Sequence, residues 1–448
     1  MRQDKSKQTV NAARPPFLKM RYGGYYHRGV PPENAELTHI GPNTPCGEYF
    51  RRFWHPVCYS DELRDLPVRV KILDEELVVF RDQSGAVGLL ELHCPHRGTS
   101  LEYGLIAERG IRCCYHAWLF DVDGTILETP GEPADSPLKD KLCHGAYPTH
   151  EAHGLVFAYM GPPDRKPAFP TYDSLVRLGF RVVPGQKYCY PCNWLQVLEN
   201  AMDPAHTAYL HTIVSGAVFT PEFGVLPELD FVETPIGMIY VATRRIGENV
   251  WARMVENVMP NLQQVSPIWE DGKREHGFTG PMMSRWIVPL DDTNTMLIEL
   301  RHISEAEGVT PARFADREFT LPQQTAAPTY EEGQRRPGDY EAQVSQRPIA
   351  IHGLEHLGVT DRGVSMFRKL VRQGIQTVRD GGEPKGINHA NDGPIPTYCN
   401  DTVIRTPAAE SPDADTRLIR ETGRRLAESY LRGSREGTLT GAQQRGKG

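Results

Sequence analysis

The chain has 448 residues, of which 39% are hydrophobic and 9% aromatic, enough apolar side chain for roughly two to three domains with a core. Its net charge of −7 argues against a nucleic-acid-binding surface as the main function. No apolar run approaches the roughly 18 residues needed to cross a bilayer. Residues 1–17 lack the apolar stretch of a secretory signal, and nine cysteines are too few for a disulfide scaffold, so we expect a cytoplasmic protein with reduced thiols.

The N-terminal third alternates between turns and short strand-like runs. Residues 1–44 are polar and interrupted by proline and glycine pairs, so we expect an N-terminal arm there. From about Arg51 onward, runs such as Val68–Ile72 and Glu76–Phe80 are bounded by turn residues. This pattern predicts a small all-β domain over residues 45–165.

Two cysteine–histidine pairs lie within this domain. One residue separates Cys94 from His96, and two residues separate Cys113 from His116. A zinc finger usually takes both cysteines from one end and both histidines from the other, whereas here each loop offers one thiolate and one imidazole. The arrangement suits a Rieske [2Fe-2S] cluster, in which the thiolates hold one iron and the imidazoles the other. The pairs therefore predict a carrier of single electrons.

The cysteines outside these loops are expected to be small buried hydrophobic residues. They are Cys46, Cys58, Cys143, Cys189, Cys192 and Cys399. Cys189 and Cys192 have the spacing of a metal-binding pair, but no second such pair exists, which argues against a zinc site.

Beyond the proline-rich segment Pro162–Pro167 the pattern mixes helices and strands, so a second domain is expected over residues 166–432. The expected elements are a helix at Asn193–Leu210, strands at Met238–Thr243, Ser284–Val288 and Met296–Ile303, an exposed loop at 320–338, and an amphipathic helix at Asp415–Arg432. The tail, residues 433–448, is expected to be disordered.

The first of these helices carries a second group of possible metal ligands. Glu199, Asp203 and His206 follow the i, i+4, i+7 pattern of one helix face. His211 follows His206 by five residues, which an ideal helix would place about 140° apart. Both can bind one ion only if the helix loosens between them, as at a π-bulge. A single histidine is usually not a ligand, but two histidines with a carboxylate form the facial triad of non-haem Fe(II) oxygenases.

Together these motifs resemble those of one enzyme family. Cys94–Gly98 and Cys113–Asp121 resemble the Rieske motif of the ring-hydroxylating oxygenases, and Glu199–His211 resembles their mononuclear-iron motif. The similarity extends from about residue 40 to residue 380. In the phthalate dioxygenase-like and aryl O-demethylase branch, a carboxylate precedes a block similar to Gln343–Gly358. Asp339 stands in that place, so the resemblance implies that Asp339 completes the iron site with His206 and His211.

Several alternatives to these ligands exist. Glu341 is the nearest rival of Asp339. Weaker rivals are Glu331, Glu332 and Glu355, and His352 and His356 are expected to have structural or pocket roles. In the second Rieske loop, Cys114 stands where proline is common and Ala117 where glycine is common. The family spacing favours Cys113 over Cys114 as the ligand, and a β conformation would tolerate Ala117.

The resemblance implies an α+β fold, with the all-β Rieske domain followed by a helix–antiparallel-sheet (helix-grip-like) catalytic domain. It also implies a terminal oxygenase component. Electrons from a separate NAD(P)H-dependent reductase, with or without a ferredoxin, would enter the cluster and pass to a mononuclear Fe(II) that activates O₂. The chain has no dinucleotide-binding glycine motif of its own. Asp203 is implied as a bridge from a Rieske histidine of one subunit to His206 of the next, in a homotrimer.

The substrate is less constrained than the reaction class. The family implies an aromatic compound, and its carboxylated members would need a cationic partner. Candidate cations, for which a solvated sheet face is the competing expectation, are Arg244, Arg245, Arg253, Arg285 and Arg301. One alternative is an O-demethylase that releases formaldehyde from a methoxylated aromatic acid. Another is a Rieske electron-transfer protein or a structural zinc protein without oxygenase activity.

Overall fold

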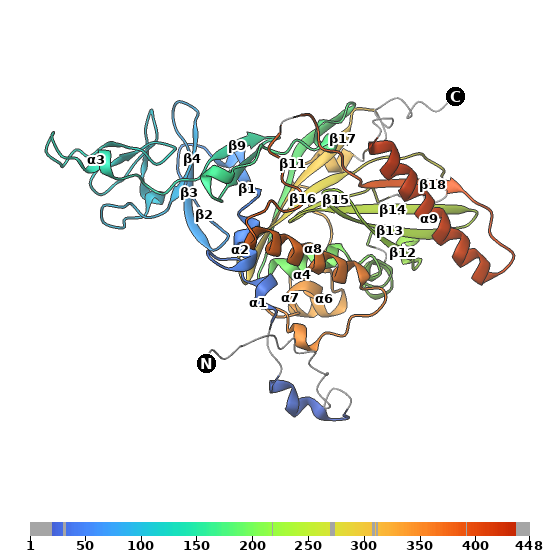
Figure 1. The fold of residues 1–448 in the computed structure, drawn as a ribbon. Coiled ribbons are helices and arrows are strands. Elements are labelled where there is room, and N and C mark those ends of the chain that lie inside the picture. The colour runs from blue at the N-terminus through green and yellow to red at the C-terminus, as the bar shows by residue number, and fades with distance from the viewer. Residues whose placement is uncertain are drawn as a thin grey trace, which may run out of the picture.

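The computed structural model describes residues 20–29, 33–216, 218–268, 274–306, 310, 312–390 and 392–435. Figure 1 shows a lobe of short strands, coloured blue to teal, beside a large antiparallel sheet that carries helices on both faces. No helix of the described ranges is long and apolar enough to cross a membrane.

The N-terminal lobe contains three small antiparallel sheets. The first has the order β1 (Trp54–Tyr59), β10 (Leu155–Tyr159) and β9 (Thr149–Ala152). The second is β2 (Val68–Ile72), β3 (Glu75–Arg81) and β4 (Val87–Glu91). The third is β5 (Leu105–Ile106), β6 (Ile111–Arg112), β7 (Leu119–Phe120) and β8 (Ile126–Glu128). The helices of this part are α1 (Ala35–Thr38), α2 (Pro45–Phe50) and α3 (Leu138–Lys141).

The C-terminal part is built on one eight-stranded antiparallel sheet. In spatial order its strands are β11 (Phe180–Tyr190), β17 (Asn294–Ser304), β16 (Met283–Asp291), β15 (Leu262–Val265), β14 (Asn249–Val258), β13 (Gly237–Ile246) and β12 (Glu228–Glu233), and β18 (Asn400–Arg405) also pairs with β14. Its helices are α4 (Trp194–Ala201), α5 (His206–Ala208), α6 (Tyr330–Arg335), α7 (Asp339–Val344), α8 (Arg362–Arg379) and α9 (Pro412–Arg435).

Helices cover both faces of this sheet. Asp230 and Phe231 are neighbours on β12 and therefore point to opposite faces. Asp230 accepts a hydrogen bond from Arg424 of α9, whereas Phe231 packs against Gly363 of α8. Because Phe231 lies opposite Tyr240 in the β12–β13 register, Tyr240 shares the face covered by α8. That face carries the cavity described below.

One hydrophobic cluster spans the two parts and includes Tyr59 of β1 and Leu300 of β17, while the cysteine loops pack in a cluster of their own. The Tyr59 hydroxyl donates to the backbone oxygen of Glu299 at 3.0 Å. Lys71 Nζ lies 2.9 Å from Asp291 Oδ2. The N-terminal lobe is therefore packed firmly onto the large sheet.

The predicted α+β architecture is confirmed, and three expected elements need correction. The helix expected at Asn193–Leu210 is interrupted after Ala201. The loop expected at 320–338 contains helix α6. Helix α9 continues through Arg435, beyond the predicted start of the tail at residue 433, and residues 436–448 lie outside the described residues.

The predicted boundaries of the arm (1–44), the Rieske domain (45–165) and the catalytic domain (166–432) remain predictions. The large sheet begins with β11 at Phe180. Residues 1–19 of the arm lie outside the described residues, and Gly23–Gly29 forms a short 3-10 helix.

Candidate active site

The segment between α4 and His211 is not a continuous helix. Asp203 precedes Pro204, and a residue before proline is disfavoured in the helical conformation. The Asp203 carboxylate instead accepts a hydrogen bond from the Ala205 backbone at 3.0 Å, which closes a turn. The chain restarts as α5 and continues as a π-helix over Tyr209–Val214. The helix therefore loosens between His206 and His211, as the five-residue spacing predicts.

Three side chains converge on one point beneath this turn. Asp339 Oδ1 lies 3.5 Å from His206 Nε2 and 3.3 Å from His211 Nε2. Their ligand atoms all lie within 4.8 Å of one another, and no other group of three histidine, cysteine or acidic residues in the described ranges does so. The rival Glu341 is occupied elsewhere, because it accepts hydrogen bonds from the Gly338 and Ala327 backbones.

The arrangement of the donor atoms suits metal binding. His206 Nδ1 contacts the backbone oxygen of Asp203, which only accepts hydrogen bonds, so Nδ1 carries a proton and Nε2 is the nitrogen that faces Asp339. Burial raises the pKa of Asp339, but its hydrogen bond to His211 and the charges of both histidines outweigh burial and lower it. Two imidazole nitrogens and an ionised carboxylate are the donor set of a non-haem Fe(II) site.

Two amides hold the Asp339 carboxylate in place. Asn200 Nδ2 donates to Oδ1 at 3.1 Å, and Gln324 Nε2 donates to Oδ2 at 2.8 Å. Asp203 lies on the opposite side of His206, with its Oδ2 3.7 Å from His206 Nδ1.

Glu199 does not join this group. Its carboxylate is bound by the Arg368 guanidinium of α8, which also binds Glu355. The expectation that Glu199 shares a face with Asp203 and His206 is wrong, because the helix ends between them.

The three converging residues line a cavity of about 630 Å³ on the α8 face of the sheet. Most of its wall is apolar and comes from several elements. The apolar lining residues are Ala201, Phe219, Phe223, Val255, Val265, Ile268, Met282, Met283 and Leu321. Such a space accepts a small organic molecule beside the ligand atoms.

Two arginines give this cavity a cationic side. Arg253 is only 5% exposed; it donates to the Tyr240 hydroxyl at 2.7 Å and to the Ser266 backbone at 3.1 Å, and its Nε has no hydrogen-bond partner among the described residues. Arg285 Nε donates to Gln263 Oε1 at 2.5 Å. Neither arginine forms an ion pair with an acid in the described part of the chain.

The solvated sheet face expected for the candidate arginines is wrong for three of them, because Arg244, Arg253 and Arg301 are buried. Arg301 is held by Glu299, and Arg245 by Asp415, so neither is available to a ligand in the cavity. Only Arg253 and Arg285 of the five candidates line the cavity.

The cysteine–histidine loops bring like ligands together. Cys94 and Cys113 are each 3% exposed and lie in the same buried cluster, and burial, with the neighbouring Cys113 thiol, raises the pKa of Cys94. The rings of His96 and His116 have centroids 4.4 Å apart, and His96 stacks on Trp118. His96 Nδ1 is buried and has no hydrogen-bond partner in the described part of the chain, as expected of a nitrogen that binds a metal.

This geometry argues against a single zinc ion. In a tetrahedral zinc site the ligand atoms lie within about 3.8 Å of one another, given Zn–S bonds of about 2.3 Å. No three of Cys94, His96, Cys113 and His116 meet even a 4.8 Å limit. The thiol pair and the imidazole pair therefore fit a larger cluster with two metal ions.

Two expectations for the cysteine-bearing segments are corrected. Ala117 has a φ of +58°, in the left-handed region that favours glycine, and not the β conformation that would tolerate alanine. Cys143 and Cys189 are exposed rather than buried, whereas Cys46, Cys58, Cys192 and Cys399 are buried as expected.

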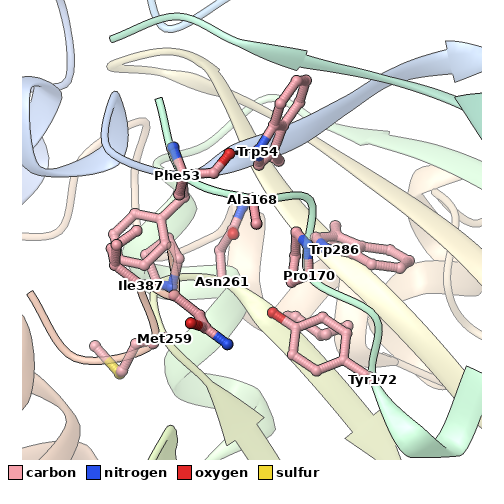
Figure 2. A pocket seen from close by; sticks show the side chains of 14 residues that line it. Phe53, Trp54, Ala168, Pro170, Tyr172, Met259, Asn261, Trp286 and Ile387 are labelled. Carbon is pink, nitrogen blue, oxygen red and sulfur yellow. Dashed lines mark hydrogen bonds between the residues drawn. The ribbon is translucent and has the colours of Figure 1, made fainter. Parts of the chain in front are cut away.

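A second cavity, shown in Figure 2, lies where β1 meets the large sheet. Its lining includes the aromatic residues Phe53, Trp54, Tyr172 and Trp286. None of its lining residues is a histidine, cysteine or acid, so it offers no strong metal ligand.

Comparison with known proteins identifies the family of this chain. The Rieske [2Fe-2S] domain family matches residues 53–145. The tert-butanol monooxygenase / tert-amyl alcohol desaturase oxygenase subunit of Aquincola tertiaricarbonis is 44% identical, with 89% of each chain covered. The chain belongs to the Rieske oxygenases. The phenoxybenzoate dioxygenase subunit alpha of Ectopseudomonas oleovorans is 38% identical over 84% of this Rieske oxygenase and 93% of its relative.

Other relatives place this Rieske oxygenase near the expected branch. The 5,5'-dehydrodivanillate O-demethylase oxygenase subunit of a Sphingobium strain is 31% identical over 85% of this chain and 90% of its own, and a phthalate 4,5-dioxygenase oxygenase subunit also matches. The solved structure of the Pseudomonas putida CBB5 NdmA QL mutant with theobromine has the same fold, with a TM-score of 0.58, 21% identity, and 75% of this chain and 94% of that chain covered.

The protein is therefore the terminal oxygenase component of a multicomponent, O₂-dependent Rieske oxygenase, and its cofactors are a Rieske [2Fe-2S] cluster and a mononuclear iron. The alternatives of a pure electron-transfer protein or a structural zinc protein do not fit relatives that are oxygenase subunits over most of the chain.

Sequence reasoning missed the residues that surround the ligands. Gln324 was placed in an exposed loop, yet it is 5% exposed and bound to Asp339. The sequence around Tyr240, Phe219 and Phe223 does not indicate a binding site, because aromatic residues in such positions are typical of an ordinary hydrophobic core.

Proposed function

We propose that Cys94, His96, Cys113 and His116 hold the Rieske cluster, and that His206, His211 and Asp339 hold the mononuclear iron. The convergence of the last three on one point, with an ionised carboxylate, carries this proposal. The paired thiols, the paired imidazoles and the partnerless His96 Nδ1 support the assignment of the cluster.

When bound, the cluster and the iron supply single electrons and the activation of O₂. The chain's own residues prepare the place for this chemistry. Asp203 holds the proton of His206 on Nδ1, and Asn200 and Gln324 orient the carboxylate of Asp339. The apolar wall keeps bulk water from the substrate.

We further propose that Asp203 links His206 to a Rieske histidine of a neighbouring subunit in a homotrimer. Asp203 supports this role because its side chain is 28% exposed while it lies beside His206. The electron donor is a separate NAD(P)H-dependent reductase, alone or with a ferredoxin. The cytoplasmic location expected from the sequence remains a prediction.

The substrate that the cavity fits best is an aromatic compound with a carboxylate. The cavity lining contains two arginines, Arg253 and Arg285, and two acids, Asp203 and Asp339, whose charges cancel. A divalent metal ion bound there would therefore make the net charge of the cavity positive. An anionic head group would complement that excess and bind the open Nε of Arg253. Phenoxybenzoate, named for one relative, combines these features.

Two other substrate classes have support among the relatives. O-demethylation of a methoxylated aromatic acid would use the same cationic side and release formaldehyde. A compact tertiary alcohol is the substrate named for the relative at 44% identity, and it would leave the cationic side without a counter-ion. Ring hydroxylation of a carboxylated aromatic is the function that we propose.

The metal assignment is tested by counting iron in the purified full-length protein. We expect three irons per chain and a Rieske-type reduced EPR signal. His206→Ala and Asp339→Ala should each lose one iron and all oxygenase activity while they keep the Rieske signal. Zinc in place of iron, or activity that survives both substitutions, would refute the assignment.

The substrate class is tested by O₂ consumption with a reductase present, using phenoxybenzoate, a methoxylated benzoate and tert-butanol. For the carboxylate substrate we expect Arg253→Gln to raise KM by about 10- to 100-fold, because a hydrogen bond to a charged group is lost. Arg245→Gln, which lies outside the cavity beside Asp415, is the matched control. Turnover of tert-butanol alone, unchanged by Arg253→Gln, would refute the carboxylate proposal.

A further inference from the structure

A chain of hydrogen bonds connects the cationic side of the cavity with the carboxylate of the iron site. Gln324 donates to Asp339 Oδ2 at 2.8 Å. The Gln324 side-chain oxygen faces Arg285 Nη1 at 3.5 Å and the Tyr190 hydroxyl at 3.4 Å. Arg285 in turn donates to Gln263.

The orientation of the Gln324 amide follows from its neighbours. An ionised carboxylate only accepts hydrogen bonds, and a guanidinium only donates them. The amide nitrogen must therefore face Asp339 and the amide oxygen must face Arg285. Gln324 is 5% exposed, so water has little access to either end.

The two oxygens of Asp339 have different surroundings. Oδ1 faces both histidine Nε2 atoms and accepts from Asn200. Oδ2 accepts from Gln324, whereas the contacts with the two histidines are made by Oδ1. The hydrogen bond from Gln324 therefore competes with any approach of Oδ2 to a metal at Oδ1.

Arg285 strengthens this effect. A cation beside the amide oxygen polarises the amide, and a polarised amide is a better hydrogen-bond donor. Gln263 holds Arg285 Nε at 2.5 Å and donates to the Ala201 backbone at the end of α4 at 3.3 Å, so Arg285 is itself fixed.

We propose that Gln324, polarised by Arg285, is a positioning residue that keeps Asp339 bound to the metal through a single oxygen. This inference rests on the proposed iron site and adds to it the residues that set how its carboxylate binds. The competing explanation is that Gln324 only fills buried space, as any side chain of its size would.

The test uses full-length protein that has lost its mononuclear iron but kept its Rieske cluster, titrated with Co²⁺ as a visible probe. Gln324→Leu keeps the volume and removes the donor. We expect it to weaken Co²⁺ binding by about 10- to 100-fold, the usual effect of losing a partner of a metal ligand. We also expect a weaker visible Co²⁺ band, because Oδ2 becomes free to join the metal and raises its coordination number. A residue that only fills space would not alter this band.

Two further variants complete the design. Gln343→Leu is the matched control, because Gln343 is also buried on α7, and among the described residues no hydrogen bond joins its side chain to Asp339. It should bind Co²⁺ within twofold of the wild type. The Arg285 side chain acts on Asp339 only through Gln324. Arg285→Leu should therefore weaken Co²⁺ binding and the visible Co²⁺ band, as Gln324→Leu does, but by a smaller factor.

The absorbance of the Rieske cluster reports in every variant whether the chain is folded. A folded Gln324→Leu with wild-type Co²⁺ affinity and spectrum would overturn the inference. If that variant does not fold, an Arg285→Leu protein with wild-type affinity and spectrum would overturn it equally. Failure of the proposed iron site is a separate result, since His206→Ala would then leave Co²⁺ binding unchanged.

Discussion

Ala117 shows how one residue can carry strain beside a cofactor loop. It lies directly after His116 with a φ of +58°. Its backbone oxygen accepts from Arg112 at 2.8 Å, and its amide donates to the Cys113 oxygen at 3.1 Å, so the loop holds this conformation from both sides. A side chain with a Cβ is disfavoured there by roughly 1–2 kcal/mol relative to glycine.

Replacing this residue should therefore stabilise the loop. We expect Ala117→Gly to raise the free energy of unfolding by about 0.5–1 kcal/mol, because relief of strain exceeds the extra chain entropy that glycine brings to the unfolded state. The measurement is loss of Rieske absorbance in a thermal scan. Ala86→Gly, at the half-buried residue before β4, is the comparison; an unfolding midpoint for Ala117→Gly below that of the wild type would contradict the argument.

At the scale of elements, α4 depends on α8. The Arg368 guanidinium binds Glu199 of α4 and Glu355, and the Arg368 side chain is 10% exposed. This network fixes the end of α4 from which Asn200 reaches Asp339. Removing one partner of a buried ion pair leaves an uncompensated buried charge. The free-energy cost of that charge is larger than the net stabilisation that the ion pair provides.

Arg368→Met should accordingly lower the free energy of unfolding by about 3 kcal/mol, since two carboxylates would lose their cation. Arg372→Met, one turn further along α8, removes only a 43% exposed arginine that lies 3.6 Å from Glu36. It should change stability by less than about 0.5 kcal/mol. Urea unfolding of both variants measures the difference, and equal effects would mean that the network contributes nothing beyond surface charge.

At the scale of the whole molecule, β1 joins the Rieske lobe to the large sheet. His55 on β1 is fully buried and stacks on Phe50, while its Nε2 contacts the Phe50 backbone oxygen at 2.8 Å. Burial lowers the pKa of His55 to about 4, against the hydrogen bond to Phe50, which raises it. The folded protein thus keeps this ring neutral at pH values where the unfolded chain would protonate it.

Stability should therefore fall in mild acid. Above about pH 6.5 neither state binds the proton, and the contribution of His55 is complete. As the pH falls from about 6.5 to about 4, only the unfolded chain gains the proton, and roughly 3 kcal/mol is lost. Urea unfolding at pH 7.0 and pH 4.5 measures this, with His55→Gln as the comparison. An equally steep pH dependence in His55→Gln would exclude His55 as the cause.

Local patterns were sufficient to predict the proposed ligands that are close together in the chain. The cysteine–histidine pairs and the spacing of His206 and His211 depend on a few consecutive residues, and so does the loosened turn between the two histidines. The expected strands at Met238–Thr243 and Ser284–Val288 lie within β13 and β16 for the same reason. Strand alternation, however, cannot tell whether a face meets solvent, a helix or a cavity.

The sequence by itself determined the two metal-binding motifs, the α+β architecture and the family. Only the tertiary structure decided that Arg253 and Arg285 point into the cavity, that Glu199 turns to α8, and that Gln324 meets Asp339. The physical reason is separation along the chain. These contacts join strands, loops and helices that are brought together only when the sheet pairs and its faces are covered, and no local pattern encodes that.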